Sequence, residues 1–179
     1  MIDGEAMAVW MLVLFAGPAA LLGQAQSAAA APDASCGGEG VSFKVDMATG
    51  SAPTQPLAGK ALVVFIEKDV GASVASTTLA GMDGQWTGAT HGNSWFAFAV
   101  DPGMHHLCAQ THFSGWIGGG AGMALLHFNA QEGKVYYFEA KNLAFSAERQ
   151  TDVSLTQVDA DEGRFLMSTE KFVASRRKK

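Results

Sequence analysis

Short apolar segments separated by tight-turn residues run through most of this chain, and they constrain its fold more than any other feature. Residues 94–100 are rich in aromatic side chains, a composition typical of strands. The residues that follow, Asp101, Pro102 and Gly103, favour a chain reversal, because proline fixes φ and glycine accepts the positive φ of a type II turn. Residues 104–113 are then expected to form a second strand and to complete a central hairpin.

The same pattern predicts strands on both sides of this hairpin. Residues 41–47 alternate apolar and polar side chains, the period of a strand with one buried face. Residues 61–66 are continuously apolar and rich in β-branched side chains, as in a central strand covered on both faces. Asp83 and Gly84 suit a two-residue type I′ hairpin. The remaining predicted strands are residues 74–82, 85–90, 123–130, 134–140 and 153–158.

The C-terminal part of the chain carries a helical pattern. Residues 159–173 begin with acidic side chains and space their apolar residues at helical intervals, which predicts a short amphipathic helix capped by Asp159 or Asp161. About eight short strands and one helix predict an all-β protein. The expected fold is an antiparallel β-sandwich of the immunoglobulin-like or prealbumin-like kind.

The N-terminal residues predict export. An apolar block at residues 7–23 is followed by small residues, as in a secretory signal peptide, and 179 residues suit one domain. The acidic n-region departs from this pattern, and an uncleaved membrane anchor is the alternative. The expected parts are a signal peptide and cleavage zone at 1–31, an N-terminal strand and proline-containing linker at 32–58, a β-sandwich domain at 59–173 and a basic tail at 174–179.

Cys36 and Cys108 are the only two cysteines in the sequence. In an oxidising compartment, such as the periplasm or the cell exterior, an even pair most simply forms one disulfide. This bond would tie the mature N-terminus to the central hairpin. It would close a loop of about 70 residues and contribute about 4 kcal/mol in the chain-entropy model.

The charge balance restricts the class of partner. The formal net charge is −5 and charged residues make up 16% of the sequence, so no basic surface is available for nucleic acid. The basic run at 176–179 is interpreted as a solvated tail, with a contact to anionic envelope lipid or polymer as the alternative. The expected partner is an unknown envelope protein or polymer. The N-terminal apolar segment would insert into the membrane during export, and no pattern indicates an oligomeric state.

Histidines crowd the second strand of the central hairpin. His106, Cys108 and His112 would share one face, but residues 106 and 112 lie about 20 Å apart on an extended strand, too far to bind one ion. Alternation places His105 on the other face. A metal-binding domain that uses His105 or His106 with a distant histidine is therefore the alternative function. The candidate ligands are His91, His105, His106 and His127.

No catalytic motif accompanies these residues. The sequence has no serine-hydrolase elbow, phosphate loop, dinucleotide fingerprint or HExxH motif, so no catalytic residue and no cofactor is assigned. The candidate binding residues are Trp116 and Ile117, in a glycine-rich stretch, and Trp86. An exposed aromatic on a loop commonly grips a ligand, whereas packing of the tryptophan back on the sandwich is the simpler alternative.

Four blocks of sequence resemble a bacterial family of exported proteins, the domain of unknown function 2846. They are residues 59–65, 83–88, 100–107 and 133–138, and the resemblance covers residues 59–170. It implies an envelope-associated β-sandwich and transfers no catalytic residue. The leading expectation is an exported, non-catalytic β-sandwich with a binding or structural role in the cell envelope. An envelope enzyme of unknown reaction is the third hypothesis.

Overall fold

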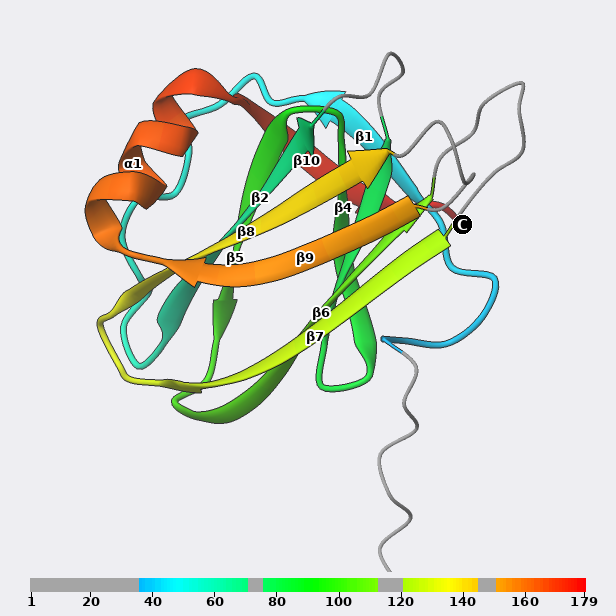
Figure 1. The fold of residues 1–179 in the computed structure, drawn as a ribbon. Helices are drawn as coiled ribbons and strands as arrows, with labels where there is room; N and C mark the ends of the chain where they lie inside the picture. Colours follow the sequence, from blue (N-terminus) through cyan, green and yellow to red (C-terminus); the bar gives the residue numbers. More distant parts are fainter. Residues whose placement is uncertain (1–35, 71–75, 113–120, 145–150) are drawn as a thin grey trace, which may run out of the picture. The chain divides into compact units, whose positions relative to one another are not determined.

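The described residues form two packed β-sheets, as predicted (Figure 1). The computed structural model describes residues 36–70, 76–112, 121–144 and 151–179. The six-stranded sheet contains, in spatial order, β1 (Phe43–Met47), β10 (Lys171–Arg177), β5 (Ser94–Val100), β2 (Ala61–Val70), β8 (Val135–Ala144) and β9 (Thr151–Val158). The four-stranded sheet contains β4 (Gln85–His91), β3 (Thr77–Met82), β6 (Gly103–His112) and β7 (Ala121–Ala130). The sandwich prediction is confirmed, with ten strands in the described ranges instead of about eight.

The predicted central hairpin is wrong. β5 pairs with β2 and β10 in the six-stranded sheet, whereas β6 pairs with β3 and β7 in the four-stranded sheet. The turn at residues 101–102 therefore carries the chain from one sheet to the other. Phe96 on β5 and Leu107 on β6 belong to the same buried cluster between the sheets. Each strand turns its apolar face toward that shared core. The two strands therefore face each other across the core and hydrogen-bond with other strands of their own sheets.

The hairpin predicted at Asp83 and Gly84 is confirmed. It joins β3 to β4, and Met82 lies directly opposite Gln85. Asp83 has φ 52° and Gly84 has φ 77°. A type I′ turn requires positive φ at both of these positions, which explains why this dipeptide marks the turn.

The six-stranded sheet is mixed and not purely antiparallel. β2 pairs in parallel with β8, and β10 pairs in parallel with β5. Val63 and Phe65 of β2 face the core between the sheets, whereas Leu62 and Val64 pack in a second cluster with Leu166 of α1 (Ala160–Thr169). Both faces of β2 are thus covered, as parallel strands require, which explains its unbroken apolar sequence.

The helix is shorter than predicted, and a strand follows it. Asp159 caps α1, and its Oδ1 accepts hydrogen bonds of 2.9 Å from the backbone N–H groups of Asp161 and Glu162. The predicted helical end and the first four residues of the predicted basic tail instead form β10, between β1 and β5. Phe172 packs on Trp95 and Val173 is buried on the opposite face. Alternate side chains of β10 thus pack on opposite faces of the sheet, which stabilises a strand here.

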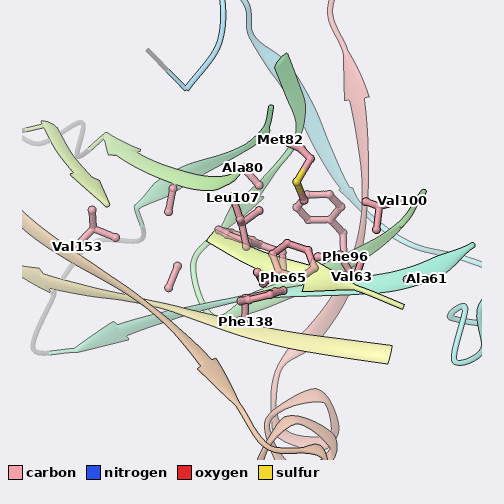
Figure 2. Close-up of a cluster of buried hydrophobic side chains, with 14 of the residues drawn as sticks. Ala61, Val63, Phe65, Ala80, Met82, Phe96, Val100, Leu107, Phe138 and Val153 are labelled. Atoms are coloured by element: carbon pink, nitrogen blue, oxygen red, sulfur yellow. The ribbon is translucent and has the colours of Figure 1, made fainter. Parts of the chain in front are cut away.

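The core between the sheets is built mostly from aliphatic and aromatic side chains. Phe65, Phe138 and Leu107 are fully buried. Figure 2 shows Phe65, Phe96 and Phe138 gathered beside Leu107, with Val153 further away. The Phe65 and Phe96 ring centroids lie 5.8 Å apart. Within the described ranges, α1 is too short and too polar to cross a membrane, and no other helix is a candidate span.

Candidate functional site

The predicted disulfide between Cys36 and Cys108 is present, with a Cα–Cα distance of 5.4 Å. Cys108 lies in the middle of β6, and both cysteines are buried. The N-terminal segment follows the outer face of the four-stranded sheet here because Gly81 of β3 has no side chain. A Cβ at Gly81 would lie 2.2 Å from the carbonyl oxygen of Cys36. We call residues 36–43 the tethered segment.

A pocket of about 690 Å³ lies between the tethered segment and the outer face of the four-stranded sheet. Apolar side chains from separate elements line it, and Gln110 and His112 of β6 add hydrogen-bonding groups. The apolar walls include Leu79 on β3 and Met123 on β7. Glu39 and Lys178 place one charge of each sign at the pocket. A concave, largely apolar surface with a few polar groups is the usual form of a binding site.

Trp86, one of the predicted binding residues, lies in the wall of this pocket. Its indole Nε1 donates a hydrogen bond of 2.9 Å to the carbonyl oxygen of Gly38. Its ring also covers Gly37, where a Cβ would lie 2.6 Å from the indole. Trp86 therefore holds the tethered segment and shapes the pocket at the same time. The other two predicted binding residues, Trp116 and Ile117, lie outside the described residues.

His105 does not act as a metal ligand in this structure, because both of its ring nitrogens have other partners. Nδ1 lies 2.7 Å from Asp83 Oδ2, and Nε2 lies 2.7 Å from the carbonyl oxygen of Asp101. An ionised carboxylate and a carbonyl only accept hydrogen bonds, so both ring nitrogens must carry hydrogen. Partial burial alone would lower the pKa of His105, but the bonds to Asp83 and Asp101 and their negative charges raise it above its ordinary value. The geometry fits an imidazolium.

The other candidate metal ligands come together only in part. His106 and His127 face each other on β6 and β7, both exposed, with ring centroids 6.4 Å apart. His91 lies on β4, where Thr77 Oγ1 is 3.0 Å from its Nδ1. Across the described ranges, no group of three or more histidine, cysteine, aspartate or glutamate side chains has a metal-binding arrangement. His127 is far from His106 in the sequence, and the sequence did not predict that the pairing of β6 with β7 brings the two together.

Six fully buried polar side chains lie between the sheets, and the sequence did not predict them as a group. Glu67 of β2 and Asn142 of β8 come from the six-stranded sheet, and hydroxyl groups from the four-stranded sheet and its preceding residue face them. We call this group the inter-sheet polar cluster, which comprises Glu67, Ser76, Thr78, Thr90, Thr111 and Asn142. Asp69, which is partly buried, lies at its border and contacts Ser76 and Asn142.

Glu67 is the centre of this cluster. Its Oε1 accepts hydrogen bonds from Ser76 Oγ, from Thr78 Oγ1 at 2.7 Å and from Asn142 Nδ2 at 2.7 Å. Burial is the largest influence on its carboxyl group and, helped by the charge of Asp69, raises the pKa of Glu67 to about 7 despite the hydroxyl hydrogen bonds that lower it. A pKa near 7 in the interior is the kind of shift found at functional sites.

One signal in the sequence could have revealed Glu67. It follows the apolar run at residues 61–66 directly and looks like the polar end of that strand. Continued alternation would have placed it on the inward face with Val63 and Phe65. β2 does continue to Val70, which carries Glu67 and Asp69 inside. No sequence pattern links them to Asn142, which follows the predicted end of its strand.

Comparison of the chain with protein-family models, curated proteins and solved structures gives no match. The resemblance to the exported family stays a prediction.

Proposed function

We propose that this chain is an exported, non-catalytic β-sandwich that binds an envelope protein or polymer in the pocket beneath its tethered segment. One observation carries this proposal. The disulfide and Trp86 hold the start of the tethered segment against the four-stranded sheet, and a pocket of about 690 Å³ lies beneath this segment. The covalent link supports an oxidising, extracytoplasmic location, because such bonds persist mainly there.

The chemistry of the pocket limits what it would bind. Leu79, Met123 and the Trp86 ring offer apolar contact, and Gln110 offers both a donor and an acceptor. Glu39 and Lys178 carry opposite charges, so the pocket has no strong preference for a charged ligand. A peptide or polymer segment with an apolar group and a neighbouring amide or hydroxyl fits these walls.

Photo-crosslinking tests the proposal in the full chain expressed in its own host. A photoreactive benzoylphenylalanine replaces Met123, which lines the pocket and is 51% exposed. The matched control carries the same group at Phe165, which is 65% exposed on α1 and lies outside the pocket. A discrete adduct from position 123 but not from position 165 supports the proposal. Equal adducts from both positions, or none from position 123, contradict it.

The metal-binding alternative has one supporting observation, the facing pair His106 and His127. Elemental analysis of untagged protein tests it. One equivalent of zinc or copper that is lost in the His127→Ala variant would favour metal binding over the pocket. Metal-free protein removes this alternative.

A further inference from the structure

Two atoms of the inter-sheet polar cluster lack hydrogen-bond partners. They are Glu67 Oε2 and Asn142 Oδ1, both on side chains that are fully buried. The other polar atoms of the same two groups are already bonded, since Asn142 Nδ2 donates to Glu67 Oε1 at 2.7 Å. An ionised carboxylate and an amide oxygen are both acceptors, so neither can satisfy the other. Two buried acceptors without a donor are costly.

Rotation of the Asn142 amide does not solve this problem. Its Nδ2 lies 2.7–3.1 Å from four oxygens, which belong to Glu67, Asp69, Ser76 and Thr78. A flipped amide would place Oδ1 against the two carboxylates. Both orphan atoms belong to the two groups that the hydrogen bond from Nδ2 to Oε1 already joins, and the cluster lacks a hydrogen for them.

We propose that Glu67 is a neutral carboxylic acid in the folded protein and donates its proton from Oε2 to Asn142 Oδ1. The acid and the amide then form a reciprocal pair, in which Asn142 Nδ2 donates to Oε1 and Oε2 donates to Asn142 Oδ1. A single proton satisfies both orphan atoms. The proton then links β2 to β8 within the six-stranded sheet, while Ser76, just before β3, and Thr78, on β3, bond Glu67 Oε1 from the side of the four-stranded sheet. We call this set of hydrogen bonds around Glu67 the clamp.

The charges around the pair favour the neutral acid. Asp69 is the charged group that contacts the cluster, and its negative charge disfavours a second one on Glu67. Strands β3, β4, β6 and β8 contribute hydroxyl and amide groups. Lys68 and Lys141 alternate to the opposite face of the sheet and bond Glu170 and Glu139. No described lysine, arginine or histidine forms an ion pair with Glu67.

The clamp makes stability depend on pH in a defined direction. The raised pKa of about 7 in the folded protein compares with an ordinary value of 4.5. Between these two values the folded state holds a proton that the unfolded chain has released. This contribution to stability is fully present below about pH 4.5 and is lost as pH rises to about 7. Above that pH the deprotonated carboxylate weakens the clamp.

The Glu67→Gln variant tests this inference. A glutamine amide can donate to Asn142 Oδ1 and accept from Asn142 Nδ2, so it reproduces the acid without a titratable proton. Unfolding by urea is measured from pH 4.5 to 8.5 on the disulfide-bonded chain. We expect wild type to lose stability relative to the variant as pH rises to about 7. The Glu132→Gln variant, an exposed carboxyl with the same chemical change, is expected to follow wild type.

A constant difference between wild type and the Glu67→Gln variant at every pH overturns the inference. A direct measurement guards against a variant that does not fold. The ¹³C chemical shift of the Glu67 side-chain carboxyl in wild-type protein should have the position of a protonated acid at pH 5.5 and titrate with a midpoint near 7. A carboxylate shift at pH 5.5 contradicts the proposal.

Discussion

His105 Nδ1 lies 2.7 Å from Asp83 Oδ2, and this contact fastens strand β6 to the hairpin turn between β3 and β4. The other Asp83 oxygen accepts the backbone N–H of His106 at 2.8 Å. Partial burial alone would raise the pKa of Asp83, but the hydrogen bonds from His106 and His105 lower it below its ordinary value. One carboxylate thus stabilises two consecutive residues of β6.

This ion pair predicts a second pH effect on stability. The His105 contribution is fully present below its ordinary pKa of 6.5 and is lost as pH rises through its raised folded value. The Asp83 contribution is present above 3.8 and is lost as pH falls through its lowered folded value. The His105→Gln variant should lose about 0.5 to 1 kcal/mol at pH 5.5, a value reduced for the solvent exposure of Asp83. The loss should shrink at high pH in paired urea titrations, and an equal loss at both pH values would contradict the ion pair.

Removal of the disulfide should destabilise the domain. The bond joins residues 72 positions apart, so its loss returns considerable freedom to the unfolded chain. The double variant Cys36→Ser, Cys108→Ser should lose about 2 to 4 kcal/mol in urea unfolding. Reduction of the wild type with dithiothreitol is the matched control. Unchanged stability in both samples would contradict a contribution of the disulfide to the stability of the fold.

Gly163 lies inside α1, and we predict that its replacement by alanine destabilises the fold. Alanine is normally favoured over glycine in a helix by about 1 kcal/mol. A Cβ at this position would lie 2.3 Å from the Tyr137 ring, because α1 packs directly on β8 here. The Gly163→Ala variant should therefore melt at a lower temperature than wild type in a circular dichroism scan. The exposed helical substitution Ser168→Ala is the control, and a higher melting temperature for Gly163→Ala would contradict this packing.

The C-terminal residues should be structural and not a dispensable tail. β10 lies between β1 and β5, and Ser175 Oγ accepts the backbone N–H of Ala89 at 2.7 Å. A chain that ends after Val173 should lose stability and amide protection in β1, whereas a chain that ends after Arg177 retains the whole strand. Hydrogen exchange followed by mass spectrometry measures both. Equal protection of β1 in the two chains would support the interpretation as a solvated tail.

The sequence was informative where the structure depends on neighbouring residues. The Asp83–Gly84 turn, the Asp159 cap and the covered strand β2 each follow from local chemistry, and Cys36 and Cys108 had no other intramolecular partner. Sheet membership was not predictable in this way. Alternation shows which face of a strand is buried, but β5 and β6 bury their apolar faces in one core from opposite sheets.

The residues of the candidate sites also divide into those that the sequence predicted and those that depend on the pairing of distant strands. Trp86 was a predicted binding residue and lines the pocket, yet the pocket itself depends on the path of residues 36–43 over the sheet. Glu67 and Asn142 are 75 positions apart, and only the parallel pairing of β2 with β8 brings them together. His105 was a candidate metal ligand in the sequence, but in the structure it pairs with Asp83. That contact depends on where the turn between β3 and β4 lies, which the sequence does not show.

The dependence of the Met123 crosslink on the disulfide tests the proposed binding function most directly. The photoreactive group at position 123 is placed in wild-type chain and in the Cys36→Ser, Cys108→Ser variant, with circular dichroism to confirm that both are folded. If the tethered segment forms the binding site, the adduct obtained from wild type is lost from the variant. An adduct of the same mass and yield from both proteins would show that binding does not use this pocket.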